Sequence, residues 1–152
     1  MQLLKIYYAY FSPGNTTEKV VSHIASSFQN YPVESINLTD YATRQEDYYF
    51  KENELLIIGV PAYGGRVPAP VVDALRHFTG SNTPVVLVAT YGNRDIDDTL
   101  IELKKNVIDK GFIPVGAASF VCQHTFLKEC AEGRPDEEDL KMAGELDRKS
   151  VV

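Results

Sequence analysis

Short runs of apolar residues alternate along the chain with segments in which apolar residues recur every three or four positions. The runs predict buried strands, and the periodic segments predict amphipathic helices. We expect strands at 3–11, 33–38, 54–60, 84–91 and 112–121, and helices at 16–30, at 70–78, from about Ile96 to just before Gly111, and from Pro135 onward. Residues 39–51 are polar and aromatic, and we expect an irregular helix there. Strands that alternate with helices are typical of βαβ units in a parallel sheet.

The polarity of these runs predicts the order of the strands. The first, third and fourth runs are almost entirely apolar, as expected when helices cover both faces and neighbouring strands flank both edges. The second run is mixed in polarity, and the fifth contains Pro114, which strands tolerate mainly at their start or on an edge. We therefore expect a three-layer α/β sandwich of the doubly wound class, with a five-stranded parallel sheet in the order 2-1-3-4-5. A ligand would bind beyond the carboxyl ends of strands one and three, where this order changes direction.

Composition narrows the functional classes. The 152 residues fit one domain, 1–152, and 44% hydrophobic residues suffice for a large core. A net charge of −6 argues against nucleic acid and anionic membranes as partners. The chain has no apolar stretch of the roughly 20 residues that a membrane span needs, and its start lacks the features of a signal peptide. Cys122 and Cys130 are too few for a disulfide framework and lack metal-ligand spacing, so we expect a cytoplasmic protein with reduced thiols.

The segment Ser-Pro-Gly-Asn-Thr-Thr at 12–17 joins the first predicted strand to the first predicted helix. It would leave hydroxyls and unpaired N–H groups at a helix N-terminus, where the helix dipole also favours an anion. The segment contains no Lys or Arg, so a phosphate there would be held by hydroxyls and amides. The alternative is an ordinary turn in which Thr16 or Thr17 caps the helix.

Two further loops are expected at the same edge of the sheet, at 61–70 and 90–95. Each places a tyrosine beside glycine at the end of a strand, Tyr63 in one loop and Tyr91 in the other. Two rings of this kind would flank a flat heteroaromatic ligand, and the glycines would let backbone approach its edge. A phosphate at one end and a flat ring at the other describe a mononucleotide. The alternatives are tyrosines that only pack at the rim, a Gly-Gly pair that only turns the chain, and Arg66 paired with an acidic neighbour.

These loops carry a family resemblance. The segment at 12–17 resembles the phosphate loop of flavodoxins, with Ser first and Thr last. The segments Tyr-Gly-Gly-Arg-Val-Pro at 63–68 and Thr-Tyr-Gly-Asn-Arg at 90–94 resemble the flavodoxin-like domain that is fused to a ferredoxin domain in many bacteria and archaea. The tail Gly-Arg-Pro-Asp-Glu-Glu-Asp at 133–139 is similar to that group as well. The resemblance extends from Leu3 to about Arg148 and implies a flavodoxin-like fold that binds flavin mononucleotide (FMN).

The resemblance also implies a role for each matching residue. Ser12, Gly14, Asn15, Thr16 and Thr17 would hold the phosphate; Tyr63 and Tyr91 would flank the isoalloxazine; Ala62, Gly64 and Gly65 would lie along its edge; and Gly92 and Asn93 would meet its polar rim. Pro61 and Thr90 complete the expected cofactor-binding set. The chain departs from the family in having Gly14 then Asn15 where Thr then Gly is usual, but Asn tolerates left-handed dihedrals. The ferredoxin half is missing, and the sequence has no closely spaced cysteines for an iron–sulfur cluster.

The implied function is that of a low-potential electron carrier between redox proteins, such as ferredoxin-type or reductase partners. Two features would tune the flavin: the acidic charge of the chain, and a Gly64–Gly65 peptide that presents a carbonyl to the ring. One alternative is an FMN-dependent NAD(P)H:quinone-type oxidoreductase, with His124 and Phe126 lining a substrate pocket. Another is a flavin-free domain that keeps only the fold. An electron-transfer flavoprotein is favoured over a substrate-converting enzyme, and the oligomeric state stays open.

Overall fold

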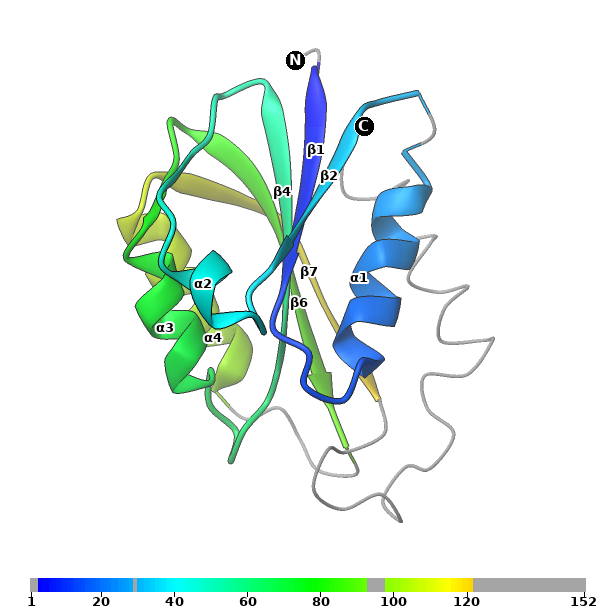
Figure 1. Cartoon of the computed structure of the whole chain (residues 1–152), viewed down its shortest axis with the longest axis vertical. Helices are drawn as coiled ribbons and strands as arrows, with labels where there is room; N and C mark the ends of the chain where they lie inside the picture. Colours follow the sequence, from blue (N-terminus) through cyan, green and yellow to red (C-terminus); the bar gives the residue numbers. More distant parts are fainter. Residues whose placement is uncertain (1–2, 29, 93–97, 122–152) are drawn as a thin grey trace.

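A parallel sheet forms the middle layer of the computed structural model, which describes residues 3–28, 30–92 and 98–121. Its strands are β1 (Lys5–Tyr10), β2 (Val33–Asn37), β4 (Glu54–Pro61), β6 (Thr83–Tyr91) and β7 (Phe112–Val121). They are ordered β2-β1-β4-β6-β7, and every neighbouring pair is parallel (Figure 1). Apart from the numbering, which counts two very short strands outside this sheet, this is the predicted order 2-1-3-4-5. The α/β doubly wound fold class is therefore confirmed.

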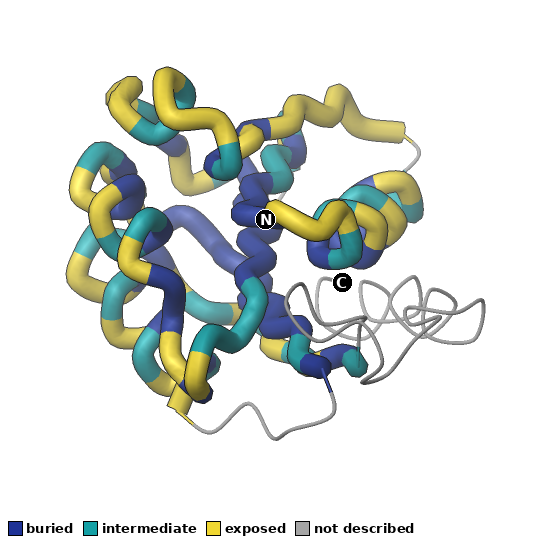
Figure 2. The backbone as a smooth tube through the Cα atoms, turned by 60° about the horizontal axis from the view of Figure 1, so that its bottom comes forward, coloured by how far each residue is buried: buried dark blue, intermediate teal, exposed yellow. Residues whose placement is uncertain are grey.

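Helices cover both faces of the sheet. Helix α1 (Thr16–Ser26) lies on one face, and α2 (Tyr41–Arg44), α3 (Ala69–Leu75) and α4 (Thr99–Asp109) lie on the other (Figure 1). The side chains of successive β4 residues point to opposite faces of the sheet. Leu55 packs in the core under α1, and Leu56 packs in the core under α3 and α4. Figure 2 shows the resulting pattern, in which buried strands run between helices that are exposed on their outer sides.

The central strands are the apolar ones because they have neighbours on every side. β4 and β6 are buried over all but their last residue. The edge strand β2 buries only Ile36. The other edge strand, β7, contains Pro114, and its register with β6 shifts between Val85 and Val86 of β6, which pair with Pro114 and Gly116 of β7. Both edges were predicted from these features, and both predictions are confirmed.

Gly59 of β4 lets α1 approach the sheet closely. A Cβ atom at this position would collide with Cγ2 of Val21 and would lie 3.1 Å from Cγ2 of Thr17. Thr17 is the second residue of α1 and the last residue of the 12–17 turn, so this contact also sets where that turn meets the sheet.

Several predicted boundaries were wrong. Helix α1 ends at Ser26 rather than near Asn30, because the N–H groups of Ser27 and Phe28 bond to the carbonyls three residues back. The helix in the 39–51 segment is limited to the four residues of α2, which is capped by Asp40; the Asp40 carboxylate accepts the Thr43 N–H at 3.0 Å. The segment then forms β3 (Tyr48–Tyr49), which pairs with β5 (Phe78–Thr79) in a second sheet. The predicted helix from Pro135 lies outside the described residues.

None of the helices in the described ranges combines the length and apolar character needed to cross a bilayer.

Candidate functional site

Three loops leave the sheet side by side at the carboxyl ends of its strands. Hydrogen bonds continue the strand pairing into these loops: the Leu38 N–H bonds to the Tyr10 carbonyl at 2.7 Å, and Phe11 bonds to Gly59 at 3.2 Å. The Ala62 N–H likewise donates to the Thr90 carbonyl at 2.8 Å. The predicted convergence of the loops after β1, β4 and β6 is therefore confirmed for their described residues. We call this end of the sheet the carboxyl edge.

The 12–17 turn is built on a left-handed asparagine. Asn15 is the N-cap of α1 and has φ 65° and ψ 0°. Its N–H bonds to the Ser12 carbonyl at 3.1 Å, which closes the turn. The expectation that Asn15 accepts the left-handed conformation of the family's glycine is confirmed.

Ser12 supplies the cap that the alternative interpretation assigned to Thr16 or Thr17. Its Oγ accepts the N–H of Glu18 at 3.0 Å. Within the described part of the chain, the N–H groups of Gly14, Thr16 and Thr17 have no partner. Unpaired N–H groups at the start of an 11-residue helix form a site for an anion. This donor set fits a phosphate group.

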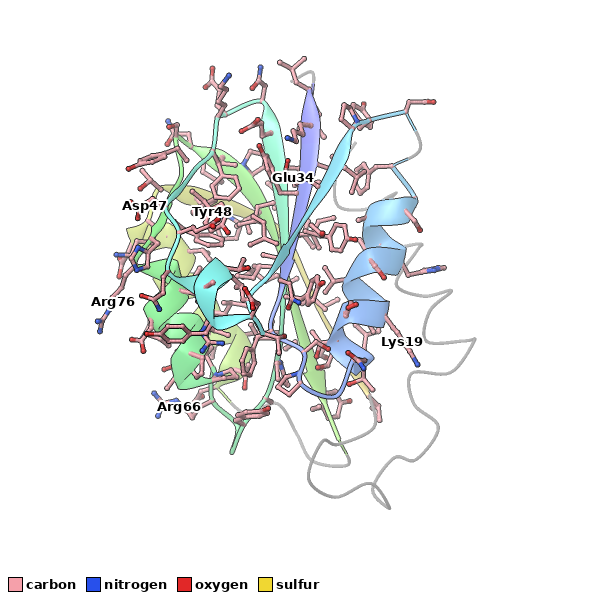
Figure 3. All side chains as sticks on the ribbon, viewed as in Figure 1. Lys19, Glu34, Asp47, Tyr48, Arg66 and Arg76 are labelled. Carbon is pink, nitrogen blue, oxygen red and sulfur yellow. The ribbon has the colours of Figure 1, made fainter. Side chains whose placement is uncertain are left out.

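The side chains near this turn that could carry a charge do not add to the attraction of an anion, which therefore depends on the backbone amides. Lys19 is exposed and points outward from α1, away from the sheet (Figure 3). Burial and the nearby Glu18 carboxylate raise the pKa of Tyr10, so that its phenol stays protonated at neutral pH.

The hydroxyls of Thr17 and Thr90 bond to each other at 2.7 Å. The two residues are 1% and 2% exposed, so this bond joins the start of α1 to the end of β6 inside the molecule. Both residues belong to the predicted phosphate and ring loops. The structure brings them together as a link between the two loops.

Thr39 holds the other side of the 12–17 turn, and sequence reasoning missed it. Its Oγ1 accepts the Ser12 N–H at 2.7 Å, across 27 positions of sequence. Arg44 in turn donates from Nη1 to the carbonyls of Leu38 and Thr39 at 2.9 and 3.1 Å. The available signal was position, because Thr39 directly follows the second predicted strand and so lies at the carboxyl edge.

The loop after β4 contains a tight turn at 63–66. Tyr63 and Arg66 exchange two backbone hydrogen bonds of 2.9 and 3.0 Å. The central residues, Gly64 and Gly65, have φ of +60° and +77°, the signs that a type I′ turn requires and that glycine adopts most readily. The Tyr63 ring packs edge-on against Phe11, with ring centroids 6.1 Å apart. Tyr63 is half-buried, and the space around a Cβ at Gly64 is open to 4 Å.

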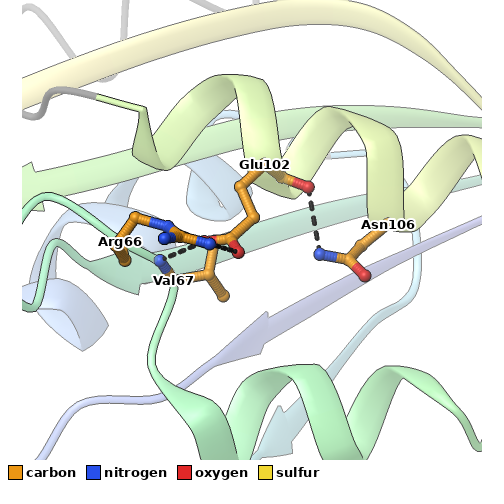
Figure 4. A network of polar contacts seen from close by, with 4 residues as sticks. All are labelled: Arg66, Val67, Glu102 and Asn106. Atoms are coloured by element: carbon orange, nitrogen blue, oxygen red, sulfur yellow. Dashed lines mark hydrogen bonds and ion pairs between the residues drawn. The ribbon is translucent and has the colours of Figure 1, made fainter.

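Glu102 of α4 joins this turn to the helix (Figure 4). Its carboxylate accepts from Nε and Nη2 of Arg66 at 3.2 and 2.7 Å and from the Val67 N–H at 2.8 Å. The Arg66 guanidinium, followed by the Val67 N–H, lowers the pKa of Glu102, and the same bond raises the pKa of Arg66. The alternative in which Arg66 pairs with an acidic neighbour is confirmed.

Solved structures that superpose on this chain include several flavodoxins. A flavodoxin from the domain Archaea superposes with a TM-score of 0.65 at 14% identity, over 94% of this chain and 93% of that one. The chain has the flavodoxin-like fold. The two-electron reduced flavodoxin of Megasphaera elsdenii gives a TM-score of 0.58 at 20% identity, over 95% and 98% of the two chains.

The flavodoxin-like fold also occurs within a longer protein. The rubredoxin oxygen:oxidoreductase of the anaerobe Desulfovibrio gigas matches with a TM-score of 0.65 at 15% identity, over 98% of this chain but 36% of that one. No protein-family model matches the sequence, and neither does any curated protein. The likeness to solved structures therefore establishes the fold, and the function has to be inferred from the site.

In this flavodoxin-like fold, the predicted residues that the structure describes lie along the carboxyl edge. Tyr91 ends β6 half-buried, and Gly92 after it is buried. Asn93 lies outside the described residues, as do His124 and Phe126 of the oxidoreductase alternative. Among the described residues, no group of three His, Cys, Asp or Glu side chains is placed to hold a metal ion. Besides Thr39, sequence reasoning missed Phe11 and Glu102, which support the tyrosine-bearing turn.

Proposed function

We propose that this chain binds FMN at the carboxyl edge and carries electrons at low potential between redox protein partners. The observation that carries the proposal is the start of α1. There Ser12 caps Glu18 and leaves the N–H groups of Gly14, Thr16 and Thr17 for an anion. A phosphate at this position needs no cationic side chain, because the amides and the helix dipole attract it.

The ring of the ligand would lie between the loops after β4 and β6. Tyr63 and Tyr91 would flank it, with Pro61, Ala62 and Thr90 at the strand ends beside it and Gly92 and Asn93 at its polar rim. The 63–66 turn supports this assignment, because the open space at Gly64 leaves room for a ligand. The peptide between Gly64 and Gly65 would offer its carbonyl and N–H to the ring edge.

FMN, when bound, would supply a ring that accepts electrons from one partner and passes them to another. The protein binds this ring, orients it and shields it from water. The net charge of −6 disfavours further negative charge on the ring, which would lower the reduction potential. Partners of this carrier would be ferredoxin-type or reductase proteins, and we place its action in the cytoplasm, as a single domain of residues 1–152.

Titration of the purified protein with FMN tests the proposal. We expect the fluorescence of FMN to be quenched on stacking, with a Kd below about 1 μM, the equivalent of about 8 kcal/mol. Riboflavin has the same ring without the phosphate and serves as the matched control, with an expected Kd at least roughly tenfold higher. Equal affinities would contradict phosphate recognition at the 12–17 turn. Absence of binding to both flavins would contradict the whole proposal and favour a domain that keeps the fold alone.

Spectroelectrochemistry on the loaded protein tests the electron-carrier role. We expect the reduction potential of bound FMN to lie below that of free FMN. We also expect that NADPH and NADH reduce it slowly unless a reductase is added. Rapid direct reduction by a nicotinamide cofactor would favour the oxidoreductase alternative, and a potential above that of free FMN would contradict the low-potential role.

A further inference from the structure

The 63–66 turn is fastened to the first turn of α4 at several points. Three N–H donors from the segment reach the Glu102 carboxylate: two from the Arg66 side chain, at 3.2 and 2.7 Å, and the Val67 backbone N–H at 2.8 Å (Figure 4). The backbone N–H of Asp98 also donates to the Gly65 carbonyl at 3.2 Å. Both the turn and the chain that leaves it are therefore held by one helix.

These contacts leave one peptide of the turn available. The cross-bonds between Tyr63 and Arg66 use the backbone groups at both ends, and Asp98 uses the Gly65 carbonyl. Within the described ranges, the Gly64 carbonyl and the Gly65 N–H have no partner. The Gly64 N–H also has no partner in these ranges, whereas the remaining backbone groups of the turn are hydrogen-bonded. The peptide between the two glycines therefore lies on a turn that is held at its ends and at the Gly65 carbonyl.

The ion pair between Glu102 and Arg66 differs from an ordinary surface ion pair. Exposed pairs contribute little to stability, but a carboxylate that also accepts a backbone N–H restrains the course of the chain. The Glu102 side chain is 24% exposed, whereas the Arg66 side chain is 64% exposed. The Glu102 backbone carbonyl accepts the Asn106 Nδ2 at 3.0 Å, so this residue is bonded on both its side-chain and its main-chain side.

We propose that Glu102 is a positioning residue for the flavin-ring site, and that it holds the 63–66 turn in the shape that the ring meets. This inference rests on the proposed function. A loop that is already ordered loses less conformational freedom when a ligand binds, so the carboxylate favours binding without touching the ligand. Its influence is confined to the ring end of the site, because its carboxylate accepts hydrogen bonds from Arg66 and Val67 and from no residue of the 12–17 turn.

Substitution of Glu102 is expected to affect FMN and riboflavin equally. In a Glu102→Ala variant, the Kd values for both flavins should rise by roughly tenfold, since the turn must then be ordered during binding. The ratio of the two Kd values should stay at the wild-type value, because the phosphate end is unchanged. The reduction potential of bound FMN should shift as well, since the peptide between Gly64 and Gly65 is no longer held in one place. Glu102→Gln keeps an oxygen for the Val67 N–H and should give a smaller rise in both Kd values.

Glu34→Ala is the matched control. It removes a glutamate of an exposed ion pair, 2.9 Å from Lys5, toward the opposite end of the sheet (Figure 3). Its Kd values and potential should equal those of the wild type. Thermal unfolding of each apoprotein separates a folding defect from a positioning defect, and Glu102→Gln provides the measurement if Glu102→Ala does not fold.

The outcomes separate the two proposals. Failure of the wild type to bind either flavin would overturn both. Binding by the wild type, together with unchanged Kd values and potential in folded Glu102→Ala or Glu102→Gln, would overturn only the positioning role. A loss of affinity for FMN but not for riboflavin would also overturn it, because the effect would then lie at the phosphate.

Discussion

A Thr16→Asp variant is expected to bind FMN about 100-fold more weakly than the wild type while its affinity for riboflavin changes little. Thr16 is the first residue of α1 and one of the residues whose N–H has no described partner. A carboxylate there would face the phosphate that the proposed site holds. Two like charges about 5 Å apart repel by about 3 kcal/mol at an effective dielectric constant near 20, enough for a factor of about 100.

The same substitution should not weaken the fold. An acidic side chain in the first turn of a helix interacts favourably with the helix dipole, by about 0.3–1 kcal/mol. We therefore expect the Tm of the variant apoprotein to equal or slightly exceed that of the wild type. Opposite signs for stability and FMN affinity would show that the loss arises from charge at the anion site and not from unfolding.

Thr16→Asn is the control for this prediction. Asparagine has the shape of aspartate without its charge, so its Kd for FMN should stay within about threefold of the wild type. Isothermal titration of all three proteins with FMN and riboflavin gives the comparison. An FMN affinity in Thr16→Asp equal to that in Thr16→Asn would contradict the placement of the phosphate at the start of α1.

The sheet could be predicted because its strands differ in how they are buried. The near-continuous apolar runs of β4 and β6 are required by helices on both faces. The polar β2 and the proline in β7 marked the edges. Once the order was set, the general rule for doubly wound sheets predicted which loops would meet.

The exact ends of helices and the very short strands could not be predicted from the spacing of apolar residues. Phe28 continues the apolar spacing of α1, but it lies beyond the helix and packs edge-on against Tyr31, with ring centroids 6.3 Å apart. The two-residue strands β3 and β5 are too short for any periodicity. Phe78 was assigned to a helix for the same reason, since a single buried aromatic residue fits either structure.

The candidate site also contains features that local sequence predicted and features that it did not. Residue types at strand ends predicted the 12–17 turn and the left-handed Asn15, because these are properties of local sequence. The partners that hold the turns, such as Thr39 for Ser12 and Glu102 for Arg66, come from distant segments. Residue type does not mark such a partner, since an exposed threonine or glutamate has the same signature. For Thr39 the one signal was its position directly after the second predicted strand, and Glu102 had none. They become visible only when the fold brings the segments together.

Gly59→Ala is expected to destabilise the protein by about 3 kcal/mol, at the upper end of the usual range for overpacked cores. Its methyl group would collide with Cγ2 of Val21 in the layer between α1 and the sheet. Both residues are fully or almost fully buried, so neither the strand nor the helix can move without disturbing the core. Urea denaturation of the apoprotein, with the slope held equal between variants, measures the change in unfolding free energy.

A double-mutant cycle with Val21→Ala identifies the cause. Val21→Ala alone should destabilise, because it removes buried methyl groups and leaves a cavity. In the double variant the alanine at position 59 fills part of that space, so the combined loss should be smaller than the sum of the single losses by about 1–3 kcal/mol. Because Thr17 also lies against Gly59, the single Gly59→Ala variant should in addition bind FMN more weakly, and the double variant should recover part of that affinity. Strict additivity of the two losses would show that Gly59 is required for a reason other than the approach of α1.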